Sequence, residues 1–499
     1  MSRRRAFELI VLVASAGIAL LAWQYRFRFP FDDTYISFRY TEHLASGQGL
    51  VWNVGGDHTE GYTNFLFIII LACCRLFSTD LLANAQVIGL VSTIISATAL
   101  YRLGSLVRDE ISGAVGAALY LLAPLTWINA LSGMETSLFG MLIVLALLAY
   151  QRGPHFLAYL LCTLATLTRP EGALLGALFL FVGFFEERQR TVFLFVLAFA
   201  LPLIAYAIWK ISYFGYLLPN SFYIKVSESS KVLPGLQYVR LFIMSAIVLL
   251  IATIGIRSRR AHPVLVVATL WALTLIVFYL FVTPLEGLYD RFLWPAFAVL
   301  CFTAAVGLHD ISSRLKLPAL PWGILLLSMA IMVRSPRTLQ SLKAHEEVWD
   351  ASMEHIATSL RNLPESSSLT LAYGDAGYVV YKSDLKHLDL FGLNDTRIAH
   401  ARSGDERAAI IRSERPDLML LPITDSDHCS IFVEDAYGVA NDSNYHPLCS
   451  AKVFPYSLVL LFNTNSPDAG HIESGVTREM SGTNSIWLPS PVLCRHFTR

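Results

Sequence analysis

The chain has 499 residues, of which 55% are hydrophobic and only 15% are charged, and its mean hydropathy of +0.52 excludes an ordinary soluble globular protein. Its 38 basic and 38 acidic side chains balance, which excludes the bulk basic surface of a nucleic-acid-binding protein. We therefore expect a membrane protein without a nucleic-acid partner, whose electrostatic interactions are local.

The N-terminus carries three arginines, residues 3–5, ahead of a mainly apolar run from Phe7 to Trp23. This pattern fits either a signal peptide or a first transmembrane helix. We favour the helix, because the run can cross most of a hydrocarbon core of about 30 Å and no small-residue cleavage site precedes Trp23.

Further apolar segments recur as far as residue 333 and predict an α-helical, polytopic membrane protein. Their lengths indicate about eleven transmembrane helices. The predicted spans are 7–24, 84–101, 113–130, 136–150, 155–168, 172–186, 191–212, 238–256, 263–282, 292–308 and 319–333. The apolar stretch Phe65–Cys74 is too short to cross a bilayer, so we expect an interfacial or re-entrant helix there.

A single composition boundary divides the chain into two expected domains. Residues 1–334 form a membrane module whose first outer loop covers residues 25–83, and the more polar residues 335–499 form an α/β domain. Short loops on one side collect the arginines, as the positive-inside rule expects of the cytoplasm. This distribution predicts a protein of the inner (cytoplasmic) membrane with a cytoplasmic N-terminus and a periplasmic or extracytoplasmic C-terminal domain.

The loops on the opposite, outer side concentrate carboxylates and aromatic residues, which indicates a wet cavity opening outward. Asp32 and Asp33 follow the first span closely. Two adjacent carboxylates can hold a divalent cation, or one can accept a proton from a hydroxyl while the other positions it. Equally, they could cap an interfacial helix that begins near Thr34.

Isolated basic residues lie on the outer side, where the positive-inside bias leaves few. They are Arg169, Lys225 and Arg291. Each could bind a phosphate group, or could snorkel to ordinary lipid head groups. Glu135 and Glu171 could cap helices without any catalytic role. His58 precedes Glu60 in the first outer loop but has no partner at metal-binding spacing, so we prefer a solvated position for it.

Several motifs carry a resemblance in their order and spacing. They are DDTYISFRY (32–40), GQGLVWNVGGDHTEGYTNFLF (47–67), SGMETSLF (132–139), LTRPEG (167–172), YFGYLLPNSFYIK (213–225), YDRFLWP (289–295), YGDAGYVVY (373–381) and LDLFGLNDTRIAH (388–400). Together they resemble the integral-membrane glycosyltransferases of the GT-C class. The most similar branch is the bacterial one that includes the arabinofuranosyltransferases capping cell-wall arabinan.

This resemblance implies sugar transfer from a polyprenyl-phosphate donor to a glycan or glycoconjugate of the cell envelope, with arabinofuranose as the nearest precedent. It makes Asp32 or Asp33 the catalytic carboxylate, with the other orienting substrate or a divalent cation (Mg, Mn or Ca). It assigns Arg169, Lys225 and Arg291 to the donor phosphate. The other matched positions, expected to contact substrate, are Tyr35, Arg39, Glu60, Tyr62, Asn64, Glu135, Glu171, Asn220 and Asp395. The chain departs from the family pattern at His58.

In the outer domain, short apolar runs alternate with polar, helix-compatible stretches such as 399–413. The runs are 369–372, 378–381, 418–421 and 457–462. Asp375, Asn394 and Asp395 could contact sugar or simply form turns. In an oxidising compartment a disulfide is expected, most simply between Cys429 and Cys449.

Two other functions fit parts of this pattern. A lipid-linked sugar flippase or transporter would also carry charged residues at membrane depth, but we find no internal repeat and the polar residues cluster in the outer loops. A non-catalytic scaffold would tolerate replacement of Asp32 and Asp33. The run of neighbouring motifs favours the enzyme.

Overall fold

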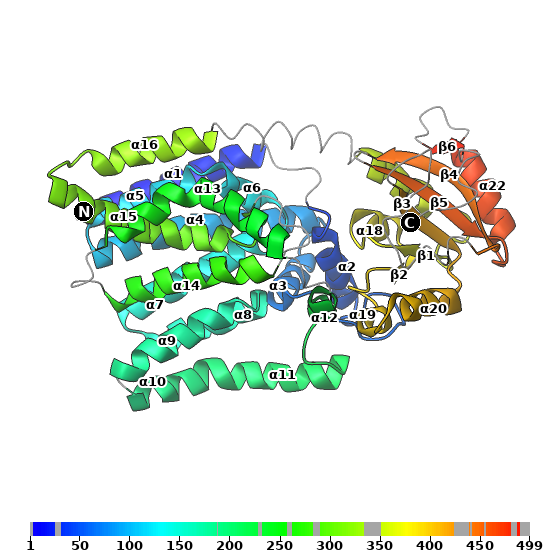
Figure 1. Cartoon of the computed structure of the whole chain (residues 1–499), viewed down its shortest axis with the longest axis horizontal. Coiled ribbons are helices and arrows are strands. Elements are labelled where there is room, and N and C mark those ends of the chain that lie inside the picture. Colours follow the sequence, from blue (N-terminus) through cyan, green and yellow to red (C-terminus); the bar gives the residue numbers. More distant parts are fainter. Residues whose placement is uncertain are drawn as a thin grey trace. The chain divides into compact units, whose positions relative to one another are not determined.

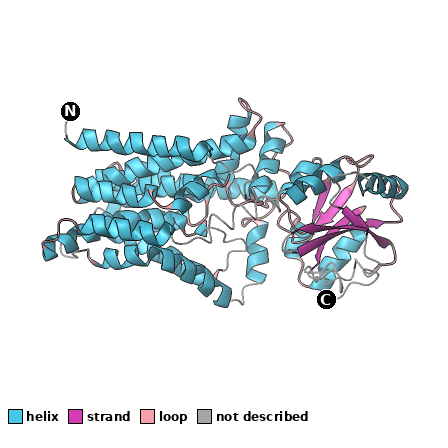
Figure 2. Ribbon diagram, turned by 90° about the horizontal axis from the view of Figure 1, so that it is seen from above, coloured by secondary structure: helices cyan, strands magenta, loops and turns pink. Residues whose placement is uncertain are grey.

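The computed structural model describes residues 3–24, 31–186, 188–227, 232–256, 262–282, 290–333, 351–423, 439, 442–453, 456–480 and 487–489. The chain forms two compact units, one helical and one containing a sheet (Figures 1 and 2). The helical unit comprises Met1–Pro30, Thr63–Gly215 and Glu228–Pro336. The α/β unit comprises Phe31–Tyr62, Tyr216–Ser227 and Arg337–Arg499.

Each of the eleven apolar segments coincides with a helix or a broken helix of the helical unit (Figure 1). The helices are α1 (Arg3–Gln24), α3 (Phe65–Arg75), α4 (Leu81–Val107), α5 (Glu110–Leu121), α6 (Pro124–Leu131), α7 (Thr136–Arg152), α8 (His155–Thr168), α9 (Gly172–Glu186), α10 (Arg188–Phe195), α11 (Leu201–Phe214), α13 (Val232–Ile254), α14 (Pro263–Phe281), α15 (Trp294–Leu315) and α16 (Leu320–Val333). A π-helical turn, Val196–Ala200, joins α10 to α11.

Among the described residues, six helices are long and apolar enough to cross a membrane, and the bent pair α5 and α6 would make a seventh. The bend of 60° falls at Pro124, which begins α6, because proline cannot continue the preceding hydrogen-bond ladder. Helices α3, α7, α8 and α9 are apolar but shorter. A multi-pass membrane protein is therefore confirmed, whereas the count of eleven spans stays a prediction.

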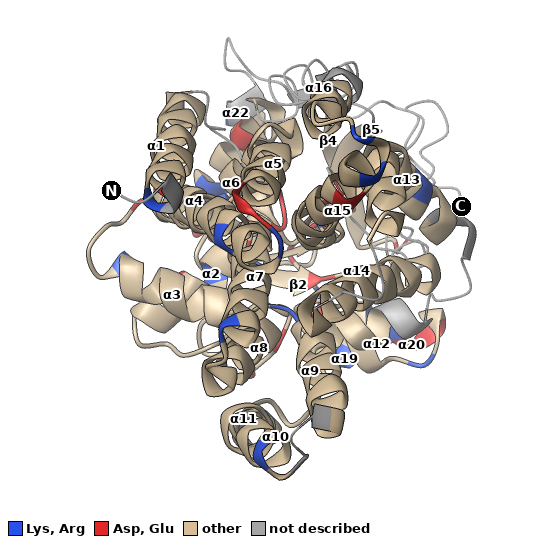
Figure 3. Ribbon diagram, turned by 90° about the vertical axis from the view of Figure 1, so that its left-hand side faces the viewer, with Lys and Arg blue, Asp and Glu red and all other residues tan. Residues whose placement is uncertain are grey.

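Helix α15 lies at the centre of the helical unit, since 78% of its apolar window is buried, against 17% for α1 and for the α10–α11 span. Figure 3 views these helices nearly end-on. Small residues bring α15 close to its neighbours: a Cβ at Gly307 would overlap the carbonyl group of Ala252 in α13. Such close approach matters in lipid, where helices associate through packing rather than through hydrophobic burial.

The α/β unit is built on a six-stranded mixed sheet with strand order β2-β1-β3-β5-β4-β6 (Figure 2). The strands are β1 (Thr370–Tyr373), β2 (Lys386–Asp389), β3 (Leu418–Ile423), β4 (Tyr445–Val453), β5 (Tyr456–Asn463) and β6 (Trp487–Pro489). Strand β1 pairs in parallel with β2 and β3, and β5 runs antiparallel to β3 and β4. The helices of its C-terminal part include α18 (Tyr378–Ser383), α19 (Thr396–His400), α20 (Gly404–Glu414) and α22 (Ala469–Met480). The run 378–381 is thus helical rather than extended.

Two segments from the N-terminal two-thirds of the chain complete the α/β unit. They are residues 31–62, which include α2 (Thr34–Ala45), and residues 216–227, which include α12 (Asn220–Ser227). A boundary at residue 334 assigns both to the membrane module, whereas the structure packs them with the C-terminal part. Hydropathy marks where polar sequence begins, but it carries no information about which polar segments pack together.

Candidate active site

Asp32 and Asp33 form the turn that precedes α2. Asp33 occupies the N-cap position of α2, but its side chain makes no capping hydrogen bond, and Asp32 points instead to the C-terminal part of the chain. The backbone N–H of Tyr378 donates to Oδ1 of Asp32 at 2.8 Å. The capping alternative is therefore wrong for Asp33, and Asp32 is held by the loop that leads into α18.

The loop between β1 and α18, residues 374–377, is shaped around the carboxylate of Asp32. A Cβ at Gly377 would overlap both carboxylate oxygens of Asp32, so a larger residue at this position would have to displace that carboxylate. Two residues earlier, Asp375 accepts a hydrogen bond from the hydroxyl of Tyr373 at 3.0 Å. The GDAGY string thus brings a third carboxylate to the Asp32–Asp33 pair.

Burial and the neighbouring carboxylates change the proton affinity of this cluster. Burial, and then the charges of Asp375 and Asp33, raise the pKa of Asp32 to about 8, although the N–H of Tyr378 opposes the rise. Burial also raises the pKa of Asp375. Carboxylates in such proximity do not all ionise near neutral pH unless a cation joins them. Within the described residues, no three His, Cys, Asp or Glu side chains form a group able to hold a metal ion.

Tyr35 and Arg39, two of the expected substrate contacts, lie on α2 and are both buried. The ring of Tyr35 packs edge-on against Tyr378, with centroids 4.9 Å apart. Arg39 donates to the carbonyls of Trp52 (2.8 Å), Val380 (3.0 Å) and Leu385 (2.9 Å) and to Oδ1 of Asn53 (3.2 Å). These contacts join α2 to the loop 46–62 and to the strand–helix segment 373–387.

The motifs around Glu60, Asn220 and Asn394 meet in the α/β unit, although they are far apart in sequence. The backbone N–H of Asn220 donates to the carbonyl of Glu60 (3.0 Å), and its side chain donates to the carbonyl of Leu393 (3.2 Å). Tyr62 packs edge-on against Tyr40, whose hydroxyl lies 3.1 Å from Oδ1 of Asn394. Glu60 and Tyr62 are 5% and 4% exposed.

The neighbouring polar residues divide into turn and surface positions. Asp395 caps α19, accepting from the N–H groups of Arg397 (3.0 Å) and Ile398 (3.3 Å), and pairs with the side chain of Arg397. The turn interpretation therefore accounts for the geometry of Asp395.

His58 is exposed, as the solvated alternative expects. Cys449 is a buried free thiol in β4, and its expected disulfide partner Cys429 lies outside the described residues.

A second polar cluster lies inside the helical unit, around the guanidinium group of Arg169. Arg169 donates to Glu135 (3.0 Å), Glu171 (3.0 Å) and the hydroxyl of Tyr279 (3.2 Å), and that hydroxyl donates to Glu171. Asn64 donates to the other oxygen of Glu135 at 3.0 Å. Side-chain exposures of 5% for Glu135, 6% for Arg169 and 11% for Glu171 show that all three charges are largely withdrawn from solvent.

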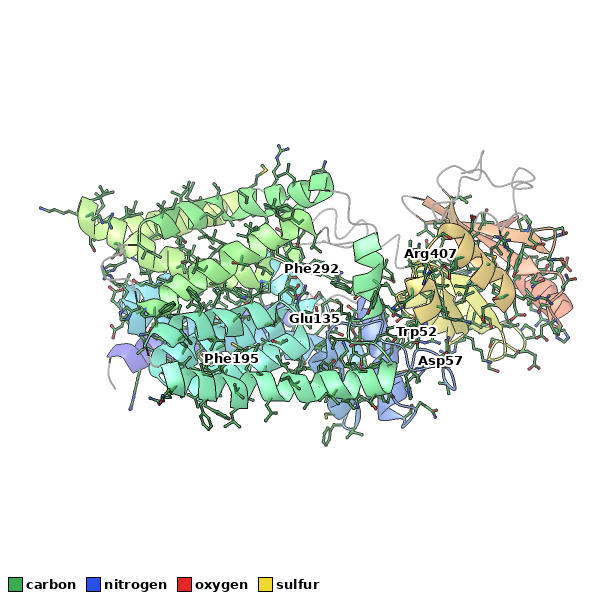
Figure 4. All side chains as sticks on the ribbon, turned by 60° about the horizontal axis from the view of Figure 1, so that its bottom comes forward. Trp52, Asp57, Glu135, Phe195, Phe292 and Arg407 are labelled. Atoms are coloured by element: carbon green, nitrogen blue, oxygen red, sulfur yellow. The ribbon has the colours of Figure 1, made fainter. Side chains whose placement is uncertain are left out.

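Phe292 connects this cluster to the second expected phosphate ligand. The guanidinium carbons of Arg169 and Arg291 lie 4.6 Å and 4.7 Å from the centre of its ring, within range of cation–π attraction. Figure 4 shows Glu135 and Phe292 near the same end of the helical unit. Lys225 belongs to α12, but its side chain lies outside the described part of the structure.

Sequence reasoning did not single out Gly377, Tyr378, Tyr279 or Phe292. Three of them, Gly377, Tyr378 and Phe292, stand inside strings that carried the resemblance, and the neighbours of Asp375 and Arg291 could have pointed to them. Tyr279 gives no such signal, because it lies in the uniformly apolar helix α14.

The chain shares its fold with solved membrane glycosyltransferases, in agreement with the GT-C resemblance of the motifs. ArnT from Cupriavidus metallidurans bound to undecaprenyl phosphate has a TM-score of 0.59 and 13% identity, over 90% of this chain and 97% of that chain. The archaeal oligosaccharyltransferase AglB from Archaeoglobus fulgidus, in complex with an inhibitory peptide and a dolichol-phosphate, has a TM-score of 0.54 and 11% identity, over 95% and 78% of the two chains.

At the level of sequence, the chain is similar to the terminal β-(1→2)-arabinofuranosyltransferase of Mycobacterium tuberculosis. The two are 27% identical over 256 residues, which make up 46% of this chain and 40% of that protein. The chain thus matches less than half the length of this curated relative. A family model described as a domain of unknown function (DUF8728) matches residues 343–464, which fall in the α/β unit.

Proposed function

We propose that this chain is a glycosyltransferase that moves a sugar from a polyprenyl-phosphate donor to a glycan or glycoconjugate of the cell envelope. The observation that carries the proposal is the Asp32 carboxylate, which accepts a hydrogen bond from the N–H of Tyr378 and packs against the Cα of Gly377. A capping role would not need a binding loop contributed by the distant residues 374–378. The GT-C fold and the similarity to an arabinofuranosyltransferase support the same reaction.

In the proposed reaction, Asp32 in its ionised form accepts the proton of an acceptor hydroxyl. The hydroxyl oxygen then forms a bond to the anomeric carbon, and the bond from that carbon to the phosphate oxygen breaks. General base catalysis of this kind contributes about 10² to 10⁴ in rate. Asp33 and Asp375 flank Asp32 as positioning groups, and a divalent cation, when present, would be held by Asp32 and Asp33.

Among the expected phosphate ligands, Arg291 fits the donor best. The guanidinium group of Arg169 already faces two carboxylates, Glu135 and Glu171, so the trio carries a net negative charge when all are ionised. Such a trio repels a phosphate and favours a positioning role for Arg169. Arg291 lies on the shared ring of Phe292, and Lys225 remains a further candidate.

The particular substrates are proposals that rest on the sequence relative. Arabinofuranose is the first donor sugar to test, and Glu60, Tyr62, Asn64 and Asn220 are the first side chains to test for sugar contact. We place the protein in the inner membrane, with a cytoplasmic N-terminus and an extracytoplasmic α/β unit, because arginines collect in one set of loops.

The test is transfer of labelled sugar from a panel of polyprenyl-phosphate donors by purified protein in lipid, with added Mg, Mn or Ca or with chelator. We expect Asp32→Asn to lower transfer at least about 100-fold at unchanged donor binding. Asp405→Asn is the matched control, because that carboxylate is exposed on α20 of the same unit and has no assigned role. Movement of the lipid-linked sugar across the bilayer without formation of a glycosidic bond would instead establish a flippase.

A further inference from the structure

The chain passes from the helical unit into the α/β unit directly after α11, between Gly215 and Tyr216. Helix α11 ends at Phe214. The next residue, Gly215, has a left-handed backbone (φ +80°), and its N–H donates to the carbonyl of Ile211 at 3.0 Å. The span Gln189–Phe214 to which α11 belongs has a mean hydropathy of 2.5 and only 17% of its window buried. Its exposed apolar side chains recur at helical spacing and mark a lipid-facing stripe: Leu201, Ile204, Ile208 and Ile211.

The next seven residues, 216–222, belong to the α/β unit and expose a second apolar face. The exposed side chains are Tyr216 (42%), Leu217 (50%), Leu218 (37%) and Phe222 (46%). Over the same stretch, Asn220 and Ser221 are buried, at 3% and 8%. The segment is therefore two-sided, with polar groups turned into the α/β unit and apolar groups turned out.

Hydrogen bonds and ring contacts fix this segment to the rest of the α/β unit. Asn220 donates to the carbonyls of Glu60 and Leu393 through its backbone and side chain. The ring of His400 contacts the rings of both Tyr216 and Tyr223, with centroids 4.3 Å and 4.2 Å apart. An apolar surface that is fixed and displayed in this way marks an interaction site.

We propose that the 216–222 segment is a membrane-interface anchor of the α/β unit, occupied by bilayer lipid. Leu217, Leu218 and Phe222 would enter the boundary between head groups and acyl chains, and Tyr216 would lie at the head groups, where tyrosine is enriched. Lipid is the occupant because the segment continues, after a single glycine, from a helix whose apolar stripe already faces lipid. The stretch 213–225 also contains no Asp or Glu, so nothing in it repels anionic lipid. This anchor does not depend on the transferase activity.

The test places an environment-sensitive fluorescent amino acid at position 222 of the full chain, in nanodiscs with or without brominated acyl chains and without polyprenyl phosphate. We expect bromination to remove at least about half of the emission, since the side chain lies at the acyl boundary. Ile208 in the α11 stripe is the positive control, and Val54, which is 55% exposed in the α/β unit, is the negative control.

A label at position 217 repeats the measurement, in case the label at 222 disturbs the fold. Quenching at both positions no stronger than at Val54 would overturn the proposal. Quenching that appears only after polyprenyl phosphate is added would also overturn it, because the segment would then receive the lipid carrier rather than the bilayer.

Discussion

The backbone N–H of Tyr378 donates a 2.8 Å hydrogen bond to Oδ1 of Asp32, across a sequence separation of 346 residues. This bond joins the turn after α1 to the start of α18 and fixes one oxygen of the carboxylate.

The first prediction concerns the pH dependence of transfer. Burial and the charges of Asp375 and Asp33 raise the pKa of Asp32 to about 8, so the ionised base becomes scarcer by about tenfold for each pH unit below that value. Transfer in chelator should rise from pH 5.5 and level off above pH 8. A divalent cation bound at the cluster would stabilise the ionised form and shift the rise to lower pH. Initial rates from pH 5.5 to 9.5, with and without Mn, measure both effects, and a flat profile in chelator would contradict the assignment.

The second prediction is that Asp32→Asn stabilises the protein at high pH. Because the folded-state pKa of Asp32 lies above the unfolded value, the folded state keeps a proton that the unfolded state releases between about pH 4 and pH 8. The free energy of unfolding therefore decreases as the pH rises through this window. The Asp32→Asn variant cannot titrate at this position, so its stability does not decrease for this reason. Its melting temperature should exceed that of the unmodified protein at pH 8.5 but not at pH 4.5. An equal shift at both values would show that the effect is not the titration of Asp32.

The third prediction couples Gly377 to Asp32. A methyl group at position 377 would overlap the carboxylate of Asp32, and such overpacking costs about 1 to 3 kcal/mol of unfolding free energy. Gly377→Ala should lower stability by that amount, and Asp32→Ala in the same background should restore most of it. Gly470→Ala is the matched control, because nothing lies within 4 Å of a Cβ there. Additive effects of the two substitutions would refute the contact.

The fourth prediction distinguishes the roles of Arg169 and Arg291, whose guanidinium groups both lie over the ring of Phe292. Arg169→Met leaves the carboxylates of Glu135 and Glu171 buried without their countercharge, which costs about 3 to 5 kcal/mol. Adding Glu135→Gln and Glu171→Gln should recover much of this loss, as measured by thermal unfolding. Arg291→Met should instead weaken binding of the polyprenyl-phosphate donor. If Arg291→Met leaves donor affinity intact while Arg169→Lys abolishes it, the assignment of the phosphate to Arg291 is wrong.

Periodic and apolar features were predictable from sequence, because they depend on local composition. All eleven apolar segments proved to be helices, and the short stretch from Phe65 proved to be α3. The break at Pro124 escaped a hydropathy average, which counts a bent pair as one run. The run 378–381 was ambiguous, because four apolar residues suit a strand or a helical turn equally well.

The candidate site was predictable in its residue types but not in its connections. Asp32 and Arg169 were found because charge is conspicuous in apolar sequence. Their partners Gly377 and Tyr279 were not, because a glycine that makes room and a tyrosine in an apolar helix become meaningful only when the chain is folded. Asp33 shows that the opposite error is also possible. It has a favourable residue type for an N-cap and occupies the N-cap position of α2, yet its side chain makes no capping hydrogen bond.

The hydrogen bonds of Arg39 bear on how proteins of this architecture can recombine. Its acceptors include the carbonyls of Val380 and Leu385, yet the donor comes from a segment more than three hundred residues earlier. A chimera that takes only residues 337–499 from a relative would receive these carbonyls without the arginine, helix and loop that contact them. Residues 31–62 and 216–227 therefore have to be exchanged together with residues 337–499 if the α/β unit is to keep its own contacts.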